Sequence, residues 1–213
     1  MQPPNNTNEG RHDPRRYAPA AARNRAVILE ILHAHVPQSG TLLEIASGSG
    51  EHAAFCAPKM PQALHWQPSD GDPAACASID AHAAASGCPR IAPALTLDVS
   101  AATWPVDQAT AIFCANMIHI APFSAAQGLI AGAGRLLPTG GPLILYGPFK
   151  RAGQHTAASN AAFDESLRER DARWGVRDLE GDIVPLATAA GLKLATIEEM
   201  PANNLIVIFH RDL

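Results

Sequence analysis

The chain has little of what marks several common classes of protein. Only 5% of its 213 residues are aromatic, and a net charge of −4 at pH 7 gives no electrostatic reason to expect nucleic-acid or membrane partners. No apolar run approaches the roughly 20 residues of a membrane-spanning helix. The first residues, MQPPNNTNEGRHDP, contain no apolar segment that would suit a secretion signal. We therefore expect a cytoplasmic protein without nucleic-acid or membrane partners.

Cysteine and histidine show no spacing typical of disulfide or metal sites. The nine histidines share no common ligand spacing, and no two cysteines form a C-x-x-C pattern, so we predict neither a disulfide framework nor a metal site. Isolated cysteines behave as small apolar residues in a reducing compartment. The four cysteines are Cys56, Cys76, Cys88 and Cys114.

Length and composition predict one folded domain preceded by a short tail. Residues 1–13 are polar and rich in proline and asparagine, which predicts a disordered N-terminal tail. Residues 14–213 suit a single α/β domain with a large core. No internal repeat divides this part of the chain.

Apolar periodicity predicts alternating helices and strands. By residue number, we expect helices at 20–35, 51–58, 72–86, 124–137, 160–174 and 182–190, and strands at 41–46, 64–67, 92–99, 109–115 and 142–146, followed by a hairpin of 192–200 and 205–211. Such an alternation predicts an α/β fold with a doubly wound, mostly parallel sheet of seven strands that ends in an antiparallel hairpin. Ligands of these sheets bind beyond the carboxyl ends of the strands, beside the first strand.

The segment 41–52, TLLEIASGSGEH, is the most informative part of the chain. An apolar strand turns through glycines into the start of a helix, where exposed N–H groups favour an anionic or strongly polar ligand. Gly48 and Gly50 lack a Cβ, so they can take positive φ and let a ligand lie against the backbone. Asp70 ends the next strand-like run and is placed to accept hydrogen bonds from a ribose diol. Together these residues predict a nucleoside-cofactor site.

Two cofactor classes fit the glycine turn. Read from Gly48, the sequence G-S-G-E-H-A is a loose match to the dinucleotide fingerprint of NAD(P)-dependent oxidoreductases. Read from Glu44, E-I-A-S-G-S-G resembles motif I of the class I S-adenosylmethionine (SAM) methyltransferases, with Ala46 in place of the first glycine. Tyr146 and Lys150 form a Y-x-x-x-K string, but the intervening Gly-Pro cannot lie within the helix that an oxidoreductase would require. The terminal antiparallel hairpin favours the methyltransferase.

Seven blocks of sequence resemble a single family. It is a small methyltransferase-like family of unassigned function, and the resemblance extends over residues 15–211. The resemblance implies a Rossmann-like class I methyltransferase fold with SAM as cofactor, and it implies no substrate. The blocks are LEIASGSGEHAAFCA, LHWQPSD, FCANMIHIAPF, LILYGPFK, SNAAFDESLR, WGVRDLE and MPANNL.

The glycine turn and the acids around it are the predicted cofactor-binding residues. We expect Ala46, Gly48 and Gly50 to line the cofactor and Asp70 to bind its ribose hydroxyls. Glu44 is expected to orient the loop or to reach the methionine part of SAM, and the alternative is a structural carboxylate that binds backbone N–H groups.

The other predicted cofactor contacts lie further along the chain. Asp98 resembles the acid that contacts the adenine amino group, although it could instead cap the segment that starts at residue 100. Asn116 and Met117 follow the fourth strand and should line the gap between adenosine and acceptor. Arg23 and Asn24 match the family's RN pair and are expected to close over the methionine carboxylate, unless they form a solvated face.

The predicted acceptor side contains one candidate for catalysis. His119, just past the fourth strand, could take a proton at neutral pH, or it could be a structural residue between two isoleucines. Because methyl transfer from a sulfonium mainly demands alignment, a strong base is not required. Aromatic, amide and charged residues form the expected acceptor pocket, or a packed lid with an Arg177–Asp178 contact. They are Tyr146, Phe149, Asn160, Trp174, Arg177, Asn203 and Asn204.

The sequence thus supports one function over two others. We predict a SAM-dependent methyltransferase that acts on a small-molecule acceptor. The first alternative is a non-catalytic SAM-sensing or partner-binding protein on the same scaffold, since fold does not fix function. An NAD(P)-dependent oxidoreductase is less favoured. The chain lacks the N-P-P-Y string, which argues against methylation of a base or amide nitrogen. The acceptor, the methylated atom and the oligomeric state stay open.

Overall fold

The computed structural model describes residues 13–212, and its centre is a seven-stranded sheet of order β3-β2-β1-β4-β5-β9-β8. The five strands from β1 to β5 pair in parallel, whereas β9 runs antiparallel between β5 and β8. The predicted fold class is therefore confirmed, including the C-terminal hairpin. The strands are β1 (Ser39–Ile45), β2 (Ala63–Asp70), β3 (Leu95–Thr96), β4 (Ala111–Ala115), β5 (Pro142–Gly147), β8 (Leu192–Met200) and β9 (Asn204–Arg211).

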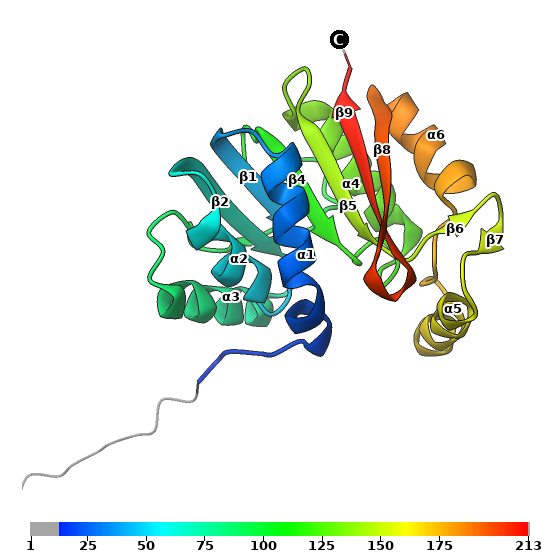
Figure 1. Cartoon of the computed structure of the whole chain (residues 1–213), viewed down its shortest axis with the longest axis horizontal. Coiled ribbons are helices and arrows are strands. Elements are labelled where there is room, and N and C mark those ends of the chain that lie inside the picture. Colours follow the sequence, from blue (N-terminus) through cyan, green and yellow to red (C-terminus); the bar gives the residue numbers. More distant parts are fainter. Residues whose placement is uncertain (1–12, 213) are drawn as a thin grey trace, which may run out of the picture.

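Helices cover both faces of the sheet, with α1 and α2 on one face and α4 and α6 on the other (Figure 1). Successive strand residues therefore point into different cores: Leu42 packs with the α1 and α2 side and Leu43 with the α4 and α6 side. The α-helices are α1 (Pro19–His35), α2 (Glu51–Cys56), α3 (Pro73–Ser86), α4 (Phe123–Leu136), α5 (Ala158–Arg170) and α6 (Val184–Ala189).

Several element boundaries differ from the sequence prediction. The third strand was expected at 92–99 but comprises only Leu95–Thr96, because the polypeptide around it pairs with β2 through isolated contacts. The helix expected at 160–174 ends at Arg170. The expected helix 182–190 begins as a π-helical turn, Leu179–Ile183, and continues as α6. These differences shift boundaries and leave the element order unchanged.

The segment between β5 and α6 forms a small excursion, of which the helix was predicted and the strand pair was not. It contains a two-stranded sheet of β6 (Lys150–Arg151) and β7 (Gln154–His155), followed by α5. Figure 1 shows this excursion beside the ends of β5 and the β8–β9 hairpin. Among the described residues, no helix is long and apolar enough to cross a membrane. The predicted N-terminal tail lies outside the described residues, except for Asp13.

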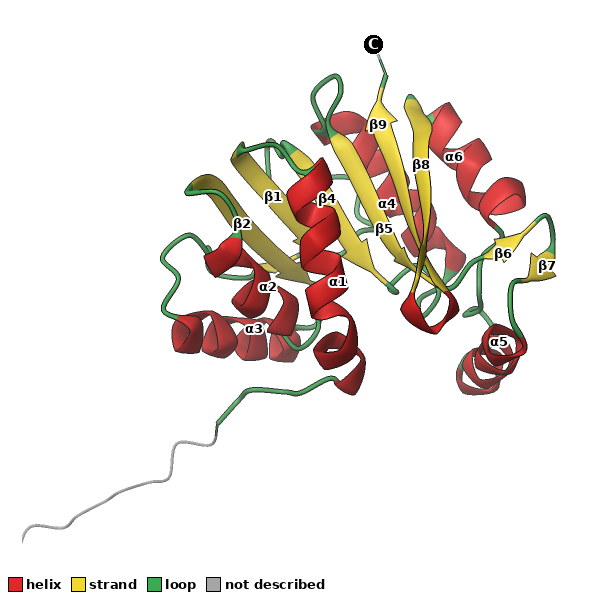
Figure 2. Cartoon of the chain, viewed as in Figure 1, coloured by secondary structure: helices red, strands yellow, loops and turns green. Residues whose placement is uncertain are grey.

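The carboxyl ends of the central parallel strands meet at one edge of the sheet. The loops that follow β1, β2, β4 and β5 lie along this edge, as Figure 2 shows in green. Such an edge is where doubly wound sheets bind their ligands. Most of the predicted site residues lie on these loops or on the elements next to them.

Candidate functional site

The turn after β1 is a left-handed backbone loop. Ala46, Gly48 and Gly50 all have positive φ, at 53°, 59° and 91°. A Cβ on Gly50 would lie 2.6 Å from the Cα of Ile79, so this glycine allows α2 to pack closely on α3. A Cβ on Gly48 would meet nothing nearer than the Ala46 carbonyl oxygen at 4.0 Å. Gly48 thus presents an open stretch of backbone at which a ligand can approach.

Asp70 is joined to this turn by hydrogen bonds. Its Oδ2 accepts the backbone N–H of Gly48 at 2.9 Å, and its Oδ1 accepts that of Asp72 at 2.9 Å. Each carboxylate oxygen has a second lone pair, so the partly exposed group keeps the capacity to bind hydroxyls. The ribose-binding role stays a prediction.

Asp98 has the capping contact that we considered as its alternative role. Its Oδ1 accepts the backbone N–H of Ser100 at 2.8 Å, and its side chain is exposed. A carboxylate can make this contact and still accept a further hydrogen bond. The predicted adenine contact is therefore compatible with the local geometry and stays a prediction.

Glu44 lies beneath the turn in a buried polar network. Its side chain is 2% exposed, its Oε2 accepts the Trp66 indole N–H at 2.9 Å, and its Oε1 lies 3.7 Å from His52 Nδ1. Burial raises the pKa of Glu44 to about 7 and lowers that of His52 to about 4. Glu44 also interacts with Ser47 of the turn, so it contacts the loop directly as well as β2 and α2.

The network continues to the α1 helix and the end of β5. The buried side chain of Asn24 is hydrogen-bonded through its Oδ1 to His52 Nε2 at 2.8 Å. The Tyr146 hydroxyl interacts with Asn24 and Asn204, and burial raises its pKa. The exposed Arg23 is near enough for its charge to act on Tyr146. Predicted cofactor residues and predicted acceptor residues are thus physically connected.

The segment that precedes α1 is fixed next to the glycine turn. The backbone N–H of Ala18 donates to Glu51 Oε2 at 2.6 Å, and that of Arg16 donates to Ser78 Oγ at 2.7 Å. The Ser78 hydroxyl in turn donates to the carbonyl oxygen of Ser49 at 2.8 Å. Glu51 and Ser78 were not among the predicted residues: Glu51 lies within the glycine segment but was given no role, and Ser78 belongs to none of the blocks.

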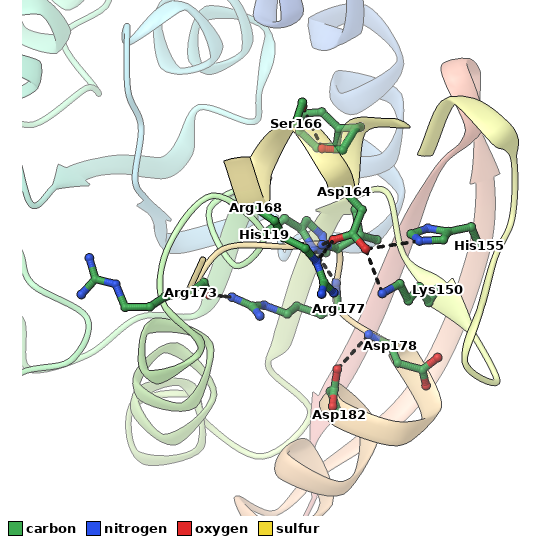
Figure 3. A network of polar contacts seen from close by, with 12 residues as sticks. His119, Lys150, His155, Asp164, Ser166, Arg168, Arg173, Arg177, Asp178 and Asp182 are labelled. Atoms are coloured by element: carbon green, nitrogen blue, oxygen red, sulfur yellow. Dashed lines mark hydrogen bonds and ion pairs between the residues drawn. The ribbon is translucent and has the colours of Figure 1, made fainter. Parts of the chain in front are cut away.

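His119 is completely buried and held as a neutral ring. Its Nδ1 accepts the backbone N–H of Arg177 at 3.2 Å (Figure 3). Its ring meets Phe149 edge-on, with the ring centroids 4.9 Å apart. Burial, and then the charge of Arg177, lowers the pKa of His119 to about 3. Since Nδ1 accepts a hydrogen bond, the ring proton is assigned to Nε2. The base role stays a prediction, and these contacts favour a neutral donor.

An unpredicted carboxylate organises the excursion after β5. Asp164 is 5% exposed and lies close to Lys150 Nζ at 3.0 Å and His155 Nε2 at 3.3 Å. It also accepts a hydrogen bond from Arg168 Nε at 3.2 Å (Figure 3) and one from the Val176 N–H at 2.7 Å. One carboxylate therefore joins β6, β7, α5 and the segment before the π-helical turn.

The expected acceptor residues form several small groups. Asn160 donates from Nδ2 to Thr156 Oγ1 at 3.0 Å and to the Asn203 carbonyl oxygen at 2.8 Å. Tyr146 and Phe149 are buried, and Trp174 is half-buried. The roles of Asn160, Asn203, Tyr146, Phe149 and Trp174 in acceptor binding stay predictions.

The guanidinium of Arg177 binds backbone carbonyls. It donates to the oxygens of Ile118 at 2.9 Å and Ala121 at 2.7 Å, so it fastens the loop after β4 to the excursion. Asp178 instead accepts the backbone N–H groups of Gly153 and Gly181. No Arg177–Asp178 side-chain bond is formed within residues 13–212, so the contact proposed for a packed lid is replaced by these bonds to the backbone.

Comparison with known families gives a match over most of the chain. A family model described as a protein of unknown function (DUF938) matches residues 15–211. The chain belongs to the DUF938 family. The match covers the same residues as the resemblance found in the sequence.

The fold of this DUF938 chain is that of methyltransferases. An O-methyltransferase family 2 protein from Planctomyces limnophilus in complex with apigenin is similar at a TM-score of 0.75 and 21% identity, over 90% of this chain and 58% of that one. An O-methyltransferase family protein from Burkholderia thailandensis is similar at a TM-score of 0.76 and 17% identity, over 91% of this chain and 57% of that one. Human N-acetylserotonin methyltransferase in complex with SAM is similar at a TM-score of 0.75 and 13% identity, over 91% of this chain and 53% of that one.

The DUF938 chain spans somewhat over half the length of these solved structures. At such low identities the likeness shows the fold. In the structure itself, the glycine turn, Asp70 and the end of β4 lie at the carboxyl edge of the parallel strands.

Proposed function

We propose that this DUF938 chain is a SAM-dependent methyltransferase that acts on a small-molecule acceptor. The observation that carries the proposal is the open glycine turn at Gly48, which is hydrogen-bonded to the Asp70 carboxylate at the end of the neighbouring strand. The fold similarity to methyltransferases, one of them in complex with SAM, supports it. The nicotinamide alternative loses support because Lys150 lies in β6 and shares no helix with Tyr146.

The residues around the turn fit a nucleoside with a charged tail. Gly48 would lie against the cofactor, the free lone pairs of Asp70 would accept its ribose hydroxyls, and Asp98 would accept from its adenine amino group. Arg23 and Asn24, on the first turns of α1, would close over its carboxylate. When bound, SAM supplies a methyl group on a sulfonium, which a nucleophile takes by direct displacement.

The chain itself would contribute alignment and exclusion of water. Arg177 bonds the excursion after β5 to the loop after β4, and Asp164 joins the parts of the excursion to one another. The two segments would form a preorganised wall beside the proposed cofactor. Asn116 and Met117 directly follow β4, and they would line the gap between the cofactor and the acceptor. Tyr146, Asn160 and the other predicted acceptor residues would shape the pocket for the small molecule.

Calorimetry with an Asp70→Ala variant tests the proposal. We expect micromolar binding of SAM and S-adenosylhomocysteine, weakened about 10- to 150-fold in the variant, because hydrogen bonds to a charged group are worth about 1.5–3 kcal/mol. Asp80→Ala is the matched control, since Asp80 also accepts a backbone N–H, that of Ala94, but lies outside the proposed site. The control should bind as the unaltered protein does.

Two results would redirect the assignment. Binding of NAD or NADP without binding of SAM or S-adenosylhomocysteine would overturn it. Tight SAM binding with no methyl consumption in any cell extract would favour the non-catalytic SAM-binding alternative.

A further inference from the structure

A cavity of about 340 Å³ lies where the segment before α1 meets α2 and α3. Figure 1 shows these elements next to one another, and hydrogen bonds from the segment to Glu51 and Ser78 join them. The volume is within the range of small-molecule pockets. None of the residues predicted to bind the cofactor lines this cavity, so it is separate from the proposed cofactor site. Its charged and aromatic lining residues include Arg15, Tyr17, Arg25, Glu51, Phe55 and Lys59.

Two cations of the lining have no carboxylate partner. Among residues 13–212, neither Arg25 nor Lys59 forms an ion pair. The guanidinium of Arg25 donates no hydrogen bond to any of these residues either, so all of its N–H groups are available to a ligand. Lys59 Nζ donates to the Phe55 carbonyl oxygen at 2.7 Å and keeps further donors. Since neighbouring like charges repel, an anion between them would be stabilised.

The Phe55 ring holds both cations at the cavity. Arg25 Cζ lies 4.6 Å and Lys59 Nζ 3.7 Å from the ring centroid. Cation–π contacts of this kind restrict the positions that a long side chain can take. Arg25 belongs to α1 and Lys59 to the 3₁₀ turn Ala57–Lys59, so the fold brings two charges from separate elements to one ring.

The other charged groups of the lining already have partners. Arg15 donates from Nε and Nη2 to the Asp13 carboxylate, at 3.0 and 2.7 Å. Glu51 Oε2 accepts the Ala18 N–H at 2.6 Å and the Ser49 hydroxyl at 3.0 Å, so this buried carboxylate is directed toward the glycine turn. The charges of Arg25 and Lys59 are therefore those left for a ligand.

An exposed aromatic ring lies beside these cations. Tyr17 is 65% exposed, the highest value for a large apolar side chain among the described residues. Its ring is oriented edge-on to His82, which also lines the cavity, with the centroids 5.1 Å apart. The remaining lining includes the small side chains of Ala54 and Ala85. An uncovered aromatic face beside small residues suits a planar group.

We propose that this cavity is a second ligand site, which binds a small phosphate monoester that carries a planar ring. The phosphate binds to Arg25 and Lys59, and the ring lies against Tyr17. A phosphate monoester has a charge of about −1.5 to −2 at pH 7, which matches two unpaired cations, whereas a carboxylate neutralises only one. Arginine binds phosphate oxygens in a bidentate manner, and lysine adds a point charge. The site does not depend on SAM binding.

Calorimetry with three probes at equal ionic strength tests the charge and the ring together. Phenyl phosphate has both features, inorganic phosphate lacks the ring, and benzoate has the ring with a single charge. We expect phenyl phosphate to bind saturably at one site and about tenfold more tightly than either of the others. Equal affinities for the three probes, or no saturable binding of phenyl phosphate at millimolar concentration, would overturn the proposal.

Charge variants locate the bound phosphate. Arg25→Gln and Lys59→Gln should each weaken phenyl phosphate binding about tenfold, because each removes a charge-assisted hydrogen bond. Arg135→Gln is the matched control: Arg135 also lies over an aromatic ring, that of Trp104 at 6.0 Å, and forms no ion pair within residues 13–212, but it belongs to α4 on the other face of the sheet. This control should bind as the unaltered protein does. An equal loss in all three variants would show non-specific attraction to surface cations.

Tyr17→Ala separates the ring from the charge. It should reduce the affinity for phenyl phosphate to that for inorganic phosphate and leave inorganic phosphate binding unchanged. Melting temperatures show that each variant is folded, and Lys59→Gln, at an exposed position, keeps the test decisive if Arg25→Gln is not. S-adenosylhomocysteine is added as a competitor. Displacement of phenyl phosphate by it would place the probe at the cofactor edge and overturn the second site.

Discussion

Gly48 and Gly87 have nearly the same backbone conformation in different surroundings. Their φ angles are 59° and 65°, and a Cβ on Gly87 would meet nothing within 4 Å. Alanine at either position should lower the free energy of unfolding by about 1–2 kcal/mol, because the left-handed conformation is unfavourable for any residue with a Cβ. Only Gly48→Ala should also weaken S-adenosylhomocysteine binding, by tenfold or more, since its Cβ would project toward the cofactor. Urea denaturation and calorimetry on both variants separate strain from ligand contact, and equal affinities would contradict the placement of Gly48.

The buried Glu44 gives stability an unusual dependence on pH. Its pKa is raised from 4.5 to about 7, so the folded protein keeps a proton that the unfolded chain loses near pH 4.5. The contribution of Glu44 to the free energy of unfolding is therefore fully present below pH 4.5 and is lost as the pH rises through 7. The whole loss is about 3 kcal/mol. His52, with its pKa lowered to about 4, stays neutral across this range in the folded protein.

Comparison with Glu44→Gln isolates this effect. Between pH 5 and pH 8, the free energy of unfolding of the unaltered protein should fall by about 2–3 kcal/mol relative to that of the variant, in urea denaturation at each pH. Glu30→Gln, at an exposed position of α1, serves as the control and should show a constant difference. If the free energies of unfolding of the unaltered protein and of Glu44→Gln also differed by a constant amount from pH 5 to pH 8, Glu44 would be ionised in the folded state.

Ala46 shows how far a motif can predict a residue. The alanine stands where the methyltransferase motif has its first glycine, and the structure gives it a φ of 53°. Local sequence therefore predicted the loop and the departure from the motif. Only the structure showed that this position has a positive φ, the conformation for which glycine is the usual residue.

Among the elements, the excursion after β5 depends on one carboxylate. Asp164→Asn removes the charge that Lys150 and Arg168 approach, while keeping the size of the side chain. We expect the free energy of unfolding to fall by about 2 kcal/mol, less than for a wholly buried pair because Arg168 is largely exposed. Amide hydrogen exchange at Val176, whose N–H donates to Asp164, should accelerate.

The neighbouring acid provides the comparison for this element. Glu165 is exposed on the same helix, so Glu165→Gln should change stability by no more than about 0.5 kcal/mol. If both variants behaved alike, Asp164 would not be the residue that holds the excursion together.

The helices and strands were predicted correctly where the apolar periodicity was clear and a glycine or proline marked the end of the element. The glycine at 191 and the prolines at 37 and 138 predicted helix ends within about a residue of those observed. The sequence failed at the third strand and at 179–183, because two paired residues and a π-helical turn leave no periodic pattern. The β6–β7 pair was missed for the same reason.

At the scale of the whole molecule, we propose that residues 14–213 form one domain. The excursion after β5 is bonded to the loop after β4 through Arg177 and His119, so it should unfold together with the sheet. Far-ultraviolet circular dichroism and tryptophan fluorescence should report a single coincident transition in urea, since Trp66 lies in the sheet and Trp174 in the excursion. Two separate transitions would show that the excursion folds independently.

The sequence by itself determined the sheet, its terminal hairpin, and the position of the glycine turn and Asp70 at the ends of neighbouring strands. It could do so because these features depend on local patterns: apolar runs, the glycine turn, and an acid at the end of a strand. Only the tertiary structure decided the surroundings of His119, Glu44 and Asp164. The partner of His119 is 58 residues away, and that of Glu44 is 22 residues away. Burial and hydrogen bonding between such distant residues set the proton positions and the pKa values, and no local pattern encodes them.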